Sequence, residues 1–431
     1  MNSGLILFIG IVQGILFLAH FVVYKAVLFF GNIDGKAALV TKLSFLGLSI
    51  FFMIGSIITA QGYSLIGRSV YTVAAIWLGV LFWLFSMAVI GSLLWFSFEY
   101  IFGNILGNVF PAISTYLGQI HTRQSFGLIL LTIVLAINVY GVINAQFIRT
   151  TKYNIVIPNI PETWWNRKIV FIADTHFGNI WNVNAAQRIV EKIEKMDPDI
   201  ILISGDFFDG PKINFDEVAQ VFEPLVKSTP EGVFFVTGNH EEYQDKEMYL
   251  APLRNIGVKI LDSNSVLVRG LRIAGISYAD GTTAEKQREA MKKIRAEINA
   301  DKNQAYASEP DQMLAEVKSK EVSDAPIIFL KHTPLLLDVA ADAGMAVQLS
   351  GHAHRGQMWP FSIITKKIYK GYDYGLKTFS GYWKNTIPVP DLRAPAKKMQ
   401  VLTTSGAGSW GPPQRFGTVS EIVEITIVKP F

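Results

Sequence analysis

Apolar residues form long unbroken runs in the first third of the chain and short, evenly spaced runs in the remainder. A helix needs about 20 consecutive apolar residues to cross the hydrocarbon core of a bilayer. The first 150 residues reach this length four times. The pattern therefore predicts four membrane-spanning helices, at residues 4–30, 38–60, 73–97 and 126–147.

A fifth apolar stretch, residues 100–120, is interrupted by Asn104, Asn108 and Pro111. Polar and helix-breaking residues are tolerated at membrane depth only where neighbouring protein or water satisfies the backbone. We therefore expect an interfacial or re-entrant helix here and not a span.

After the last span the hydrophobic period changes. Short β-branched runs alternate with amphipathic helical patterns such as residues 184–196 and 215–227, which is typical of βαβ units with parallel strands. A short helix is expected within 333–344, and the pattern at 284–324 begins helical and then turns polar, as in an exposed insertion. Residues 420–428 alternate in a way that suits an edge strand. Six further strands are predicted, within residues 168–176, 199–206, 232–240, 271–278, 325–332 and 345–354.

Trp164 and Trp165 stand at the entry to this second part. Tryptophan is enriched at membrane–water interfaces, but it is also a common core residue. The two indoles therefore either lie in the interfacial belt or cap the core of the domain, and the sequence favours neither position.

The charges divide the chain at the same place. Of 39 basic and 35 acidic residues, only eight fall in residues 1–150, six of them basic. We therefore predict a transmembrane domain at 1–150 and a soluble domain at 151–431. The soluble part carries no net charge, so a basic face for nucleic acid is not expected. The absence of cysteine excludes disulfides, thiolate metal sites and a cysteine nucleophile.

Four spans would place both ends of the membrane part on the same side of the membrane. The positive-inside rule then compares two sets of flanking basic residues. The count leans towards an extracytoplasmic soluble domain on a multi-pass cell-membrane protein, and a fifth span would reverse it. The sets are Lys25, Lys36, Lys42 and Arg123 against Arg68, Arg149 and Lys152.

His20 and Lys25 lie in or near the first span. Ionisable residues inside a membrane can mark a transport path. However, a lysine near a helix end can extend to the interface, and a single histidine usually packs against a neighbour. Without a repeated pattern of buried charge, a transporter or membrane sensor is the weaker interpretation.

Five predicted strands each end in polar residues suited to binding metal or transferring protons. Asp174 and Asp206 are 32 residues apart, and Asp206 and Asn239 are 33 apart, about one βαβ unit each. Ligands of open α/β sheets bind beyond the carboxyl ends of the strands, so these clusters are expected to converge. They are Asp174-Thr175-His176, Gly205-Asp206 with Asp209, Gly238-Asn239-His240-Glu241, Lys331-His332 and Gly351-His352-Ala353-His354.

In an extended chain, residues two apart project to the same side, so Asp174 with His176, and His352 with His354, are each expected to act as a pair. Oxygen and imidazole ligands without thiolate suit Mn, Fe or Zn better than Ca. Seven candidate ligands are more than a single tetrahedral ion can bind. They predict two divalent ions that share one carboxylate, with His352 and His354 serving different ions.

The ordered motifs D-x-H, G-D-x-x-D, G-N-H-E, a single H and G-H-x-H resemble those of the calcineurin-like metallophosphoesterases over roughly residues 168–428. The run from Ser405 to Ile427 further resembles bacterial membrane-associated phosphoesterases related to UDP-diacylglucosamine hydrolases. The resemblance implies an α/β, sandwich-like metallophosphoesterase domain after the helical membrane domain.

Carried over residue by residue, the resemblance implies the roles of the site residues. His240 would contact phosphate and protonate the leaving oxygen, and Asp209 would orient His240. Arg355 departs from the glycine expected after the second histidine, and would either pair with phosphate or point to solvent. One ion would be held by Asp174, His176, Asp206 and His354, and the other by Asp206, Asn239, His332 and His352, with Asp206 bridging.

The sequence therefore predicts a membrane-anchored, two-metal phosphoric ester hydrolase. Anchorage next to a bilayer favours a lipid or lipid-linked phosphate as substrate. Two alternatives stay open: a phosphodiesterase acting on soluble substrates, and a catalytically silent scaffold that only binds metal. Metal sites of one design can act on monoesters, diesters and pyrophosphates, so the motifs do not choose a substrate.

Overall fold

The computed structural model describes residues 3–62, 64–107, 109–117, 119–210, 213–243, 245–381 and 398–429. The chain divides into two compact units. A helical unit comprises Met1–Asn144 together with Gly411–Gln414, and an α/β unit comprises Ala145–Trp410 together with Arg415–Phe431.

Long apolar helices make up the helical unit. They are α1 (Ser3–Gly31), α2 (Gly35–Gln61), α3 (Leu65–Glu99), which continues as a π-helical turn at Tyr100–Ile105, the short α4 (Pro111–Leu117) and α5 (Ile120–Gln146). Four segments are long and apolar enough to cross a membrane: Ile9–Gly31, Gly35–Gln61, Leu65–Phe102 and His121–Gln146. At seven residues α4 is too short to cross. Within residues 100–120, where an interfacial or re-entrant helix was expected, the structure has the π-helical turn Tyr100–Ile105 and α4.

His20 is buried in this unit and both of its ring nitrogens are satisfied. Its Nδ1 lies 2.7 Å from the carbonyl oxygen of Leu16, and Trp77 Nε1 donates to its Nε2 at 3.0 Å. This is the arrangement of a packed histidine. The structure thus gives His20 a structural explanation.

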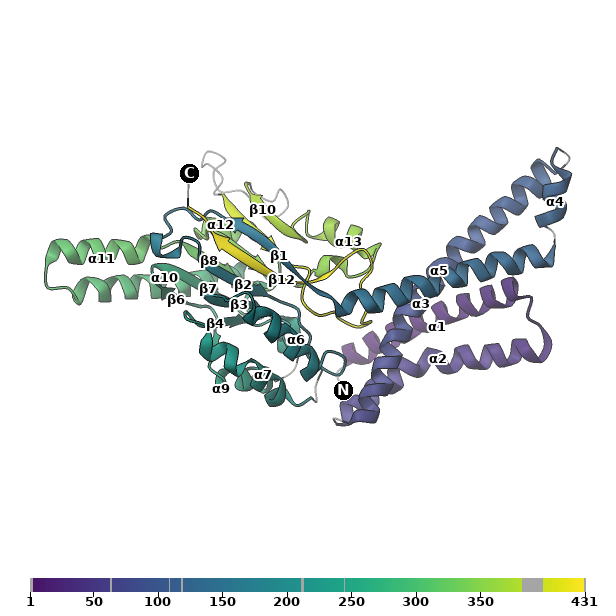
Figure 1. Cartoon of the computed structure of the whole chain (residues 1–431), viewed down its shortest axis with the longest axis horizontal. Helices are drawn as coiled ribbons and strands as arrows, with labels where there is room; N and C mark the ends of the chain where they lie inside the picture. Colours follow the sequence, from purple (N-terminus) through teal and green to yellow (C-terminus); the bar gives the residue numbers. More distant parts are fainter. Residues whose placement is uncertain are drawn as a thin grey trace. The chain divides into compact units, whose positions relative to one another are not determined.

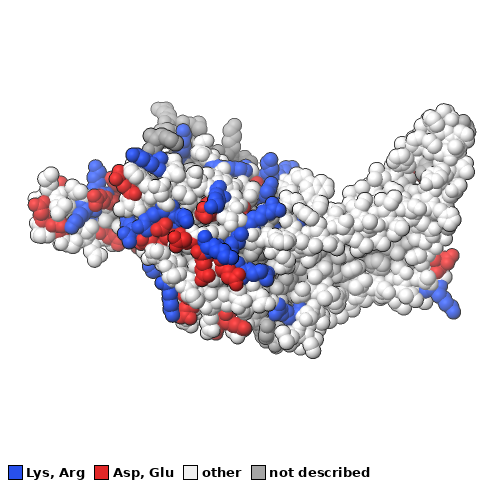
Figure 2. Space-filling view, in the orientation of Figure 1, with Lys and Arg blue, Asp and Glu red and all other residues white. Residues whose placement is uncertain are grey.

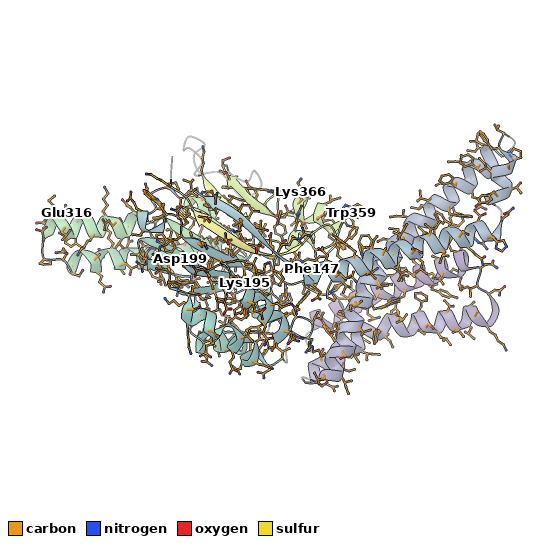
Figure 3. The ribbon with its side chains drawn as sticks, in the orientation of Figure 1. Phe147, Lys195, Asp199, Glu316, Trp359 and Lys366 are labelled. Carbon is orange, nitrogen blue, oxygen red and sulfur yellow. The ribbon has the colours of Figure 1, made fainter. Side chains whose placement is uncertain are left out.

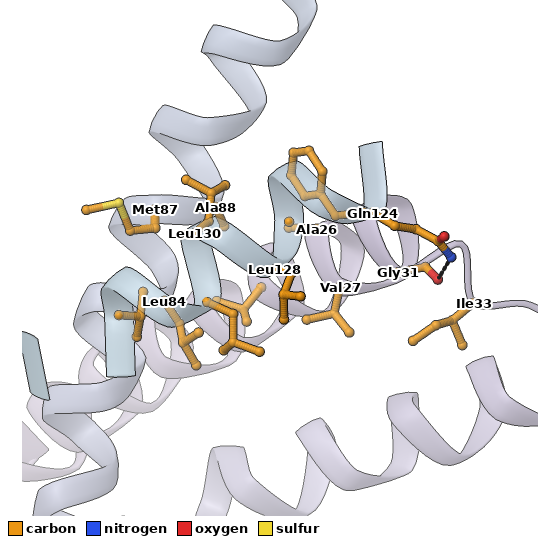
Figure 4. A pocket seen from close by; sticks show the side chains of 15 residues that line it. Ala26, Val27, Gly31, Ile33, Leu84, Met87, Ala88, Gln124, Leu128 and Leu130 are labelled. Atoms are coloured by element: carbon orange, nitrogen blue, oxygen red, sulfur yellow. Dashed lines mark hydrogen bonds between the residues drawn. The ribbon is translucent and has the colours of Figure 1, made fainter. Parts of the chain in front are cut away.

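A cavity of about 330 Å³ lies among α1, α3 and α5 (Figure 4). Its wall is almost entirely aliphatic and aromatic, with residues such as Val27, Phe30, Leu84 and Leu128. The one polar side chain of its lining, Gln124, donates its Nε2 to the carbonyl oxygen of Gly31 at 3.3 Å. The cavity therefore offers apolar volume and no acid–base group.

Two six-stranded sheets form the α/β unit. The first has the order β1-β12-β2-β3-β4-β5, with β1 (Ile148–Ile155), β2 (Lys168–Ile172), β3 (Ile200–Ser204), β4 (Val233–Val236), β5 (Lys259–Ile260) and β12 (Ser420–Ile427). The second has the order β10-β11-β9-β8-β7-β6, with β6 (Asn264–Val268), β7 (Leu271–Gly275), β8 (Ile327–Leu330), β9 (Val347–Ser350), β10 (Gly375–Phe379) and β11 (Met399–Thr403).

The two sheets pack face to face through one apolar core, to which Phe171 and Phe234 contribute from the first sheet and Ile273 and Leu349 from the second. A second core lies between the first sheet and α6, α7 and α9, and a third between the second sheet and α10 and α12. The helices are α6 (Val183–Glu194), α7 (Phe215–Ser228), α8 (Asn239–Glu242), α9 (Lys246–Asn255), α10 (Ala284–Ala307), α11 (Gln312–Asp324), α12 (Leu337–Asp342) and α13 (Phe361–Ile368).

Figure 1 shows α6, α7 and α9 gathered on one side of the strands and the α10–α11 hairpin extending away from them. The predicted fold class, apolar helices followed by a sandwich-like α/β domain, is confirmed. The region 284–324 consists of these two helices, which begin at side-chain caps from Thr283 and Asp311. Figure 2 shows acidic and basic side chains spread over the α/β unit and few on the helical unit.

One predicted strand is placed differently from expectation. Residues 420–428 were expected at a sheet edge, but β12 lies between β1 and β2. Its alternating glutamates are not solvated: Glu421 accepts hydrogen bonds from Thr404 Oγ1 and Ser405 N, at 2.9 and 2.8 Å, and Glu424 pairs with Lys152 at 2.9 Å. The alternating polar residues of β12 are therefore buried carboxylates that have hydrogen-bond or ion-pair partners. The edge position next to β12 is taken by β1.

Trp164 belongs to the core of the sandwich. It is fully buried, and its Nε1 donates to the carbonyl oxygens of Val268 and Arg269 at 3.3 and 3.2 Å. Trp165 is half-buried and stacks against Lys429, whose Nζ lies 4.8 Å from the ring centroid. Of the two positions considered for this pair, Trp164 thus takes the core position.

Candidate metal centre

Polar side chains from both sheets meet where the strands end. In the first sheet, Asp174 and His176 follow β2, Asp206 follows β3, and Asn239 and His240 follow β4. In the second sheet, His332 follows β8, and His352 and His354 follow β9. Because β2, β3 and β4 are parallel, and β8 and β9 are parallel, each sheet presents its clusters at one end.

The backbone at these positions is left-handed and not extended. The φ angles are 53° at Asp174, 48° at His176, 50° at Asp206, 66° at His352 and 46° at His354. The extended-chain argument for the two i, i+2 pairs was therefore wrong, because each pair turns sharply within three residues. Non-glycine residues in this conformation are uncommon and cluster at functional sites.

Glycine is required where the strand-end loops touch. Gly205 has a φ of 77°, and a Cβ there would lie 2.4 Å from the amide nitrogen of Gly238. A Cβ on Gly238 would lie 2.1 Å from Oδ1 of Asp206. These two glycines let the loops after β3 and β4 approach each other directly.

Three overlapping groups have ligand atoms within 4.8 Å of one another. Nε2 of His176 lies 3.0 Å from Nε2 of His354, so at most one of these two nitrogens carries a proton. Nε2 of His332 lies 3.1 Å from Oδ2 of Asp206 and 3.2 Å from Nδ1 of His352. The groups are Asp174, His176 and His354; His176, Asp206 and His240; and Asp206, His332 and His352.

Burial sets the protonation of the imidazoles. It lowers the pKa of His352 to about 3, with a further contribution from the charge of His332, and lowers the pKa of His176 to about 4, helped by His240. Both rings are therefore neutral at physiological pH and keep a lone pair. Neutral imidazole is the form that binds metal.

His332 is oriented by its other ring nitrogen. Its Nδ1 lies 2.6 Å from the carbonyl oxygen of Ser204 and must donate to it, so Nε2 is directed at Asp206. Burial opposes protonation of the ring, but the charge of Asp206 and the hydrogen bond to it outweigh burial and raise the pKa of His332 to about 9. A positive charge is therefore favoured at this point.

Asn239 supplies a test of whether the residues fit a cation. Its side chain is buried, and its Nδ2 donates to the hydroxyl of Tyr243 at 3.0 Å. Its Oδ1 is buried with no hydrogen-bond donor among the described residues. A buried amide oxygen without a partner is costly, and a cation at this point would satisfy it. The donor set thus fits a metal.

His240, a member of the second group, pairs with Asp209. Nδ1 of His240 lies 2.9 Å from Oδ1 of Asp209. Burial disfavours the charged ring, but the hydrogen bond that His240 donates to Asp209 and the charge of Asp206 raise the pKa of His240 to about 9. The exposed rings of Tyr243 and Trp410 lie beside it, with centroids 5.5 and 6.2 Å from its own. His240 therefore stands protonated at an aromatic rim.

The sequence argument assigned no role to Glu241, which organises the loop that carries Asp206. Its buried carboxylate accepts four backbone N–H groups: those of Asp206 at 2.9 Å, Phe207 at 2.8 Å, Phe208 at 3.1 Å and Gly238 at 2.7 Å. The sequence carried part of the signal, because a glutamate three residues after a helix N-cap can reach back to the N-cap backbone N–H, as Glu241 does to Gly238.

Arg415 was missed altogether. It is fully buried, and its Nη2 donates to the carbonyl oxygens of Ser405 and Gly408, each at 2.6 Å, and lies 3.4 Å from Nδ1 of His354. Nothing in the local sequence marks this role, because Arg415 is 61 residues away from His354.

Two other basic residues of the predicted clusters are accounted for by packing. Lys331 donates its Nζ to Gln287 Oε1 at 2.7 Å and to the carbonyl oxygen of Leu335 at 2.6 Å. The guanidinium of Arg355 lies 4.3 Å from the ring centroid of Tyr374, a cation–π contact that neither of its two expected orientations anticipated.

The sequence profile described as Calcineurin-like phosphoesterase matches residues 167–356, which include all nine predicted site residues. An "uncharacterized metallophosphoesterase" of Helicobacter pylori strain J99 is 30% identical, over 61% of this chain and 60% of its own length. A "transmembrane protein with metallophosphoesterase domain" of Danio rerio is 27% identical, over 71% of this chain and 63% of its own. Among solved structures, a dimetal phosphatase from Danio rerio aligns with a TM-score of 0.33 at 10% identity, covering 61% of this chain and 93% of that one.

The profile match and the motifs describe the same part of the molecule. The matched range begins immediately before β2 and ends at the turn that follows His354. It therefore contains the strand ends from which every predicted site residue projects. The α/β unit contains a calcineurin-like phosphoesterase domain, matched over residues 167–356.

Proposed function

We propose that this chain is a membrane-anchored, metal-dependent phosphoesterase that hydrolyses a phosphate ester or pyrophosphate bond. The observation that carries the proposal is the buried Oδ1 of Asn239, which has no hydrogen-bond donor among the described residues. His240, the next residue, donates its backbone N–H to Oδ1 of Asp206 at 2.9 Å. The Oδ1 of Asn239 therefore lacks a hydrogen-bond donor, and a cation at this point would take the place of that donor.

Two divalent ions would be held, with Asp206 common to both. The mixture of carboxylate, amide and imidazole groups suits Mn, Fe or Zn. The overlapping groups support this division, because Asp206 occurs in two of them and His352 and His354 occur in different ones. The first ion would be held by Asp174, His176, Asp206 and His354, and the second by Asp206, Asn239, His332 and His352.

Divalent ions in such a site lower the pKa of bound water and neutralise charge on the phosphoryl group. The residues of the chain complete the chemistry. Asp209 fixes the Nδ1–H of His240, so that the second ring nitrogen can hold a proton for the leaving oxygen. The raised pKa of His240 supports this role, because the ring is protonated at neutral pH.

We further propose that the four apolar helices span the membrane and that the phosphoesterase domain lies on the extracytoplasmic side. The length and hydropathy of the helices support the first point, and the four-to-three distribution of basic flanking residues supports the second. The chain has no cysteine, so a single cysteine at the exposed Glu316 would report the side through an impermeant maleimide. Labelling only after the membrane is permeabilised would reverse the assignment.

A lipid or lipid-linked phosphate is the proposed substrate. One residue, Phe147, separates the last apolar helix from the first strand of the α/β unit, which keeps the domain within reach of a bilayer. The resemblance of the C-terminal run to hydrolases of UDP-diacylglucosamine agrees with this substrate class and stays a prediction.

Release of nitrophenol from bis(p-nitrophenyl) phosphate by the full chain in detergent tests the proposal. We expect turnover that requires added Mn²⁺ and falls at least 100-fold in both Asp206→Asn and His240→Ala. Asp216→Asn, an exposed carboxylate in the first turn of α7, is the matched control and should keep full turnover.

Metal analysis of the same samples separates the alternatives. A folded protein that binds two ions per chain but turns over neither this ester nor a panel of lipid phosphates would be a scaffold. A folded protein that binds no metal would overturn the two-ion proposal itself.

A further inference from the structure

Helix α13 exposes its apolar side chains and turns polar ones inward, which is the reverse of a surface helix in a water-soluble domain. Its inward residues are Ser362 and Thr365, both half-buried, and Thr365 Oγ1 lies 3.4 Å from Oδ2 of Asp373. Its outward residues include Phe361, Ile364 and Ile368. An amphipathic surface helix normally buries its apolar stripe and exposes its polar one. Here the polar residues pack inward and the isoleucines are exposed.

These exposed residues form one surface, which we call the α13 patch. Its members are between 39% and 60% exposed, a large contiguous exposure of aromatic and branched side chains. Surfaces of this kind mark contact with a membrane or a partner. The α13 patch comprises Trp359, Phe361, Ile363, Ile364 and Ile368.

Basic residues accompany the patch. Lys366 and Lys367 lie in the last turn of α13 and are exposed, next to Ile368. Figure 3 labels Trp359 and Lys366 close together at the α13 end of the α/β unit, and Glu316 on α11 at the other end. Isoleucine and lysine on one short helix, with a tryptophan just before it, is the composition of a segment that lies in a bilayer interface.

The patch is joined directly to the candidate metal centre. α13 begins seven residues after His354, and a Cβ on Gly356 would lie 2.3 Å from the amide nitrogen of Ser362, so the helix packs against the turn that holds His354. Gln357 connects the same turn to Trp410, with Nε2 donating to the Trp410 carbonyl oxygen and Oε1 accepting from its N–H, each at 2.9 Å. Trp410 is the exposed indole beside His240. The turn that carries α13 is therefore tied through Gln357 to the exposed indole at the rim of the site.

We propose that the α13 patch inserts into the headgroup region of a bilayer containing anionic lipid, and that the site receives its substrate from that bilayer. The second half rests on the proposed function, and the first half does not. A bilayer is favoured over a protein partner because the same chain carries four apolar helices of membrane-spanning length. The lysines beside the patch complement anionic headgroups.

Spin labelling of the full-length chain in nanodiscs of phosphatidylcholine and phosphatidylglycerol tests the insertion. Because the chain has no cysteine, Ile364→Cys and Glu316→Cys each give one nitroxide without background. Oxygen partitions into lipid, whereas a nickel chelate stays in water. We expect the label at Ile364 to collide several times more often with oxygen than with the chelate, and the label at Glu316 to show the reverse.

Two outcomes would overturn the insertion. Equal behaviour of the two labels would place the patch in water. Protection of the Ile364 label from both reagents would mean that protein covers the patch, either a second copy or another chain.

A turnover measurement then tests the delivery of substrate. We expect the double variant Ile364→Asn, Ile368→Asn to lose about ten-fold activity on a vesicle-borne lipid phosphate and none on bis(p-nitrophenyl) phosphate. Equal loss on both substrates, or on neither, would refute delivery from the bilayer. Inserted labels on a protein inactive towards both substrates would leave the insertion standing and remove the proposed function. Turnover by a protein whose Ile364 label is exposed to water would leave the proposed function standing and remove the insertion.

Discussion

Nε2 of His332 lies 3.1 Å from Oδ2 of Asp206, although the two residues follow strands of different sheets. Asp206 lies at the start of the loop after β3 in the first sheet, and His332 follows β8 in the second. The contact therefore joins the two halves of the sandwich at one end. A cation shared by these residues would tie the two sheets together.

Metal should accordingly stabilise the fold. A ligand that binds only the native state at 100 times its Kd adds about 2.7 kcal/mol. For a domain of this size that corresponds to a rise in Tm of roughly 5–10 °C. The measurement is the thermal transition of tryptophan fluorescence in detergent, with EDTA and with excess Mn²⁺.

The Asp206→Asn variant is the control for this effect, because it removes the shared carboxylate and keeps the shape. Its Tm should not respond to Mn²⁺. The same rise in Tm in wild type and variant would show that the ion binds elsewhere.

His240 and Asp209 should affect turnover and leave metal binding intact. His240→Gln removes the proton donor and should lower kcat by about 10²-fold or more. Asp209→Asn keeps the size of the side chain but weakens the hold on Nδ1, and should have a smaller effect in the same direction. Metal content by mass spectrometry distinguishes this role from ligation, since loss of an ion in His240→Gln would make His240 a ligand.

Glu241 should matter for stability. Replacing it with glutamine presents an amide group to backbone N–H groups that need an acceptor, among them those of Asp206 and Gly238. Each buried N–H left unpaired costs about 1–3 kcal/mol, so Glu241→Gln should lower Tm by several degrees and weaken metal binding as well. Glu316→Gln, on the exposed α11, is the matched change and should leave both unchanged. A Glu241→Gln variant as stable as the wild type would contradict the role of Glu241 in organising the loop that carries Asp206.

Local patterns were enough to predict much of the α/β unit. The run from β2 through α6, β3 and α7 to β4 follows the expected order, because each element shows its period within a dozen residues. The pairing of β12 with β1 and β2 could not be predicted, since it joins residues such as Thr151 and Val423 across most of the chain. The exposed-looking glutamates of β12 are satisfied by partners that only the fold supplies.

The candidate site was likewise predicted only in part from the sequence. Residues at strand ends could be named from sequence because parallel strands bring their carboxyl ends together. The left-handed turn at Asp206 could not, because it depends on loops that touch at Gly205 and Gly238. Residues outside the motifs that hold the site residues in place could not be predicted either, and Arg415 is the clearest example.

Arg415 should hold the geometry around His354. Its Nη2 donates to the carbonyl oxygens of Ser405 and Gly408 and lies 3.4 Å from Nδ1 of His354, and its Nε also donates to the Gly408 oxygen at 3.2 Å. Lysine cannot reproduce bonds from two nitrogens of one planar group, because it carries one compact ammonium group. Arg415→Lys keeps the buried charge and loses the bonds. We expect it to lower Tm by several degrees and to weaken one of two metal-binding events in a titration, because in the proposed assignment only one ion is held by His354. Arg188→Lys is the matched control, because the side chain of Arg188 makes an exposed hydrogen bond of 3.3 Å to Gln146, and it should change neither quantity. Equal weakening of both binding events in Arg415→Lys would mean that Arg415 supports the whole domain and not His354 in particular.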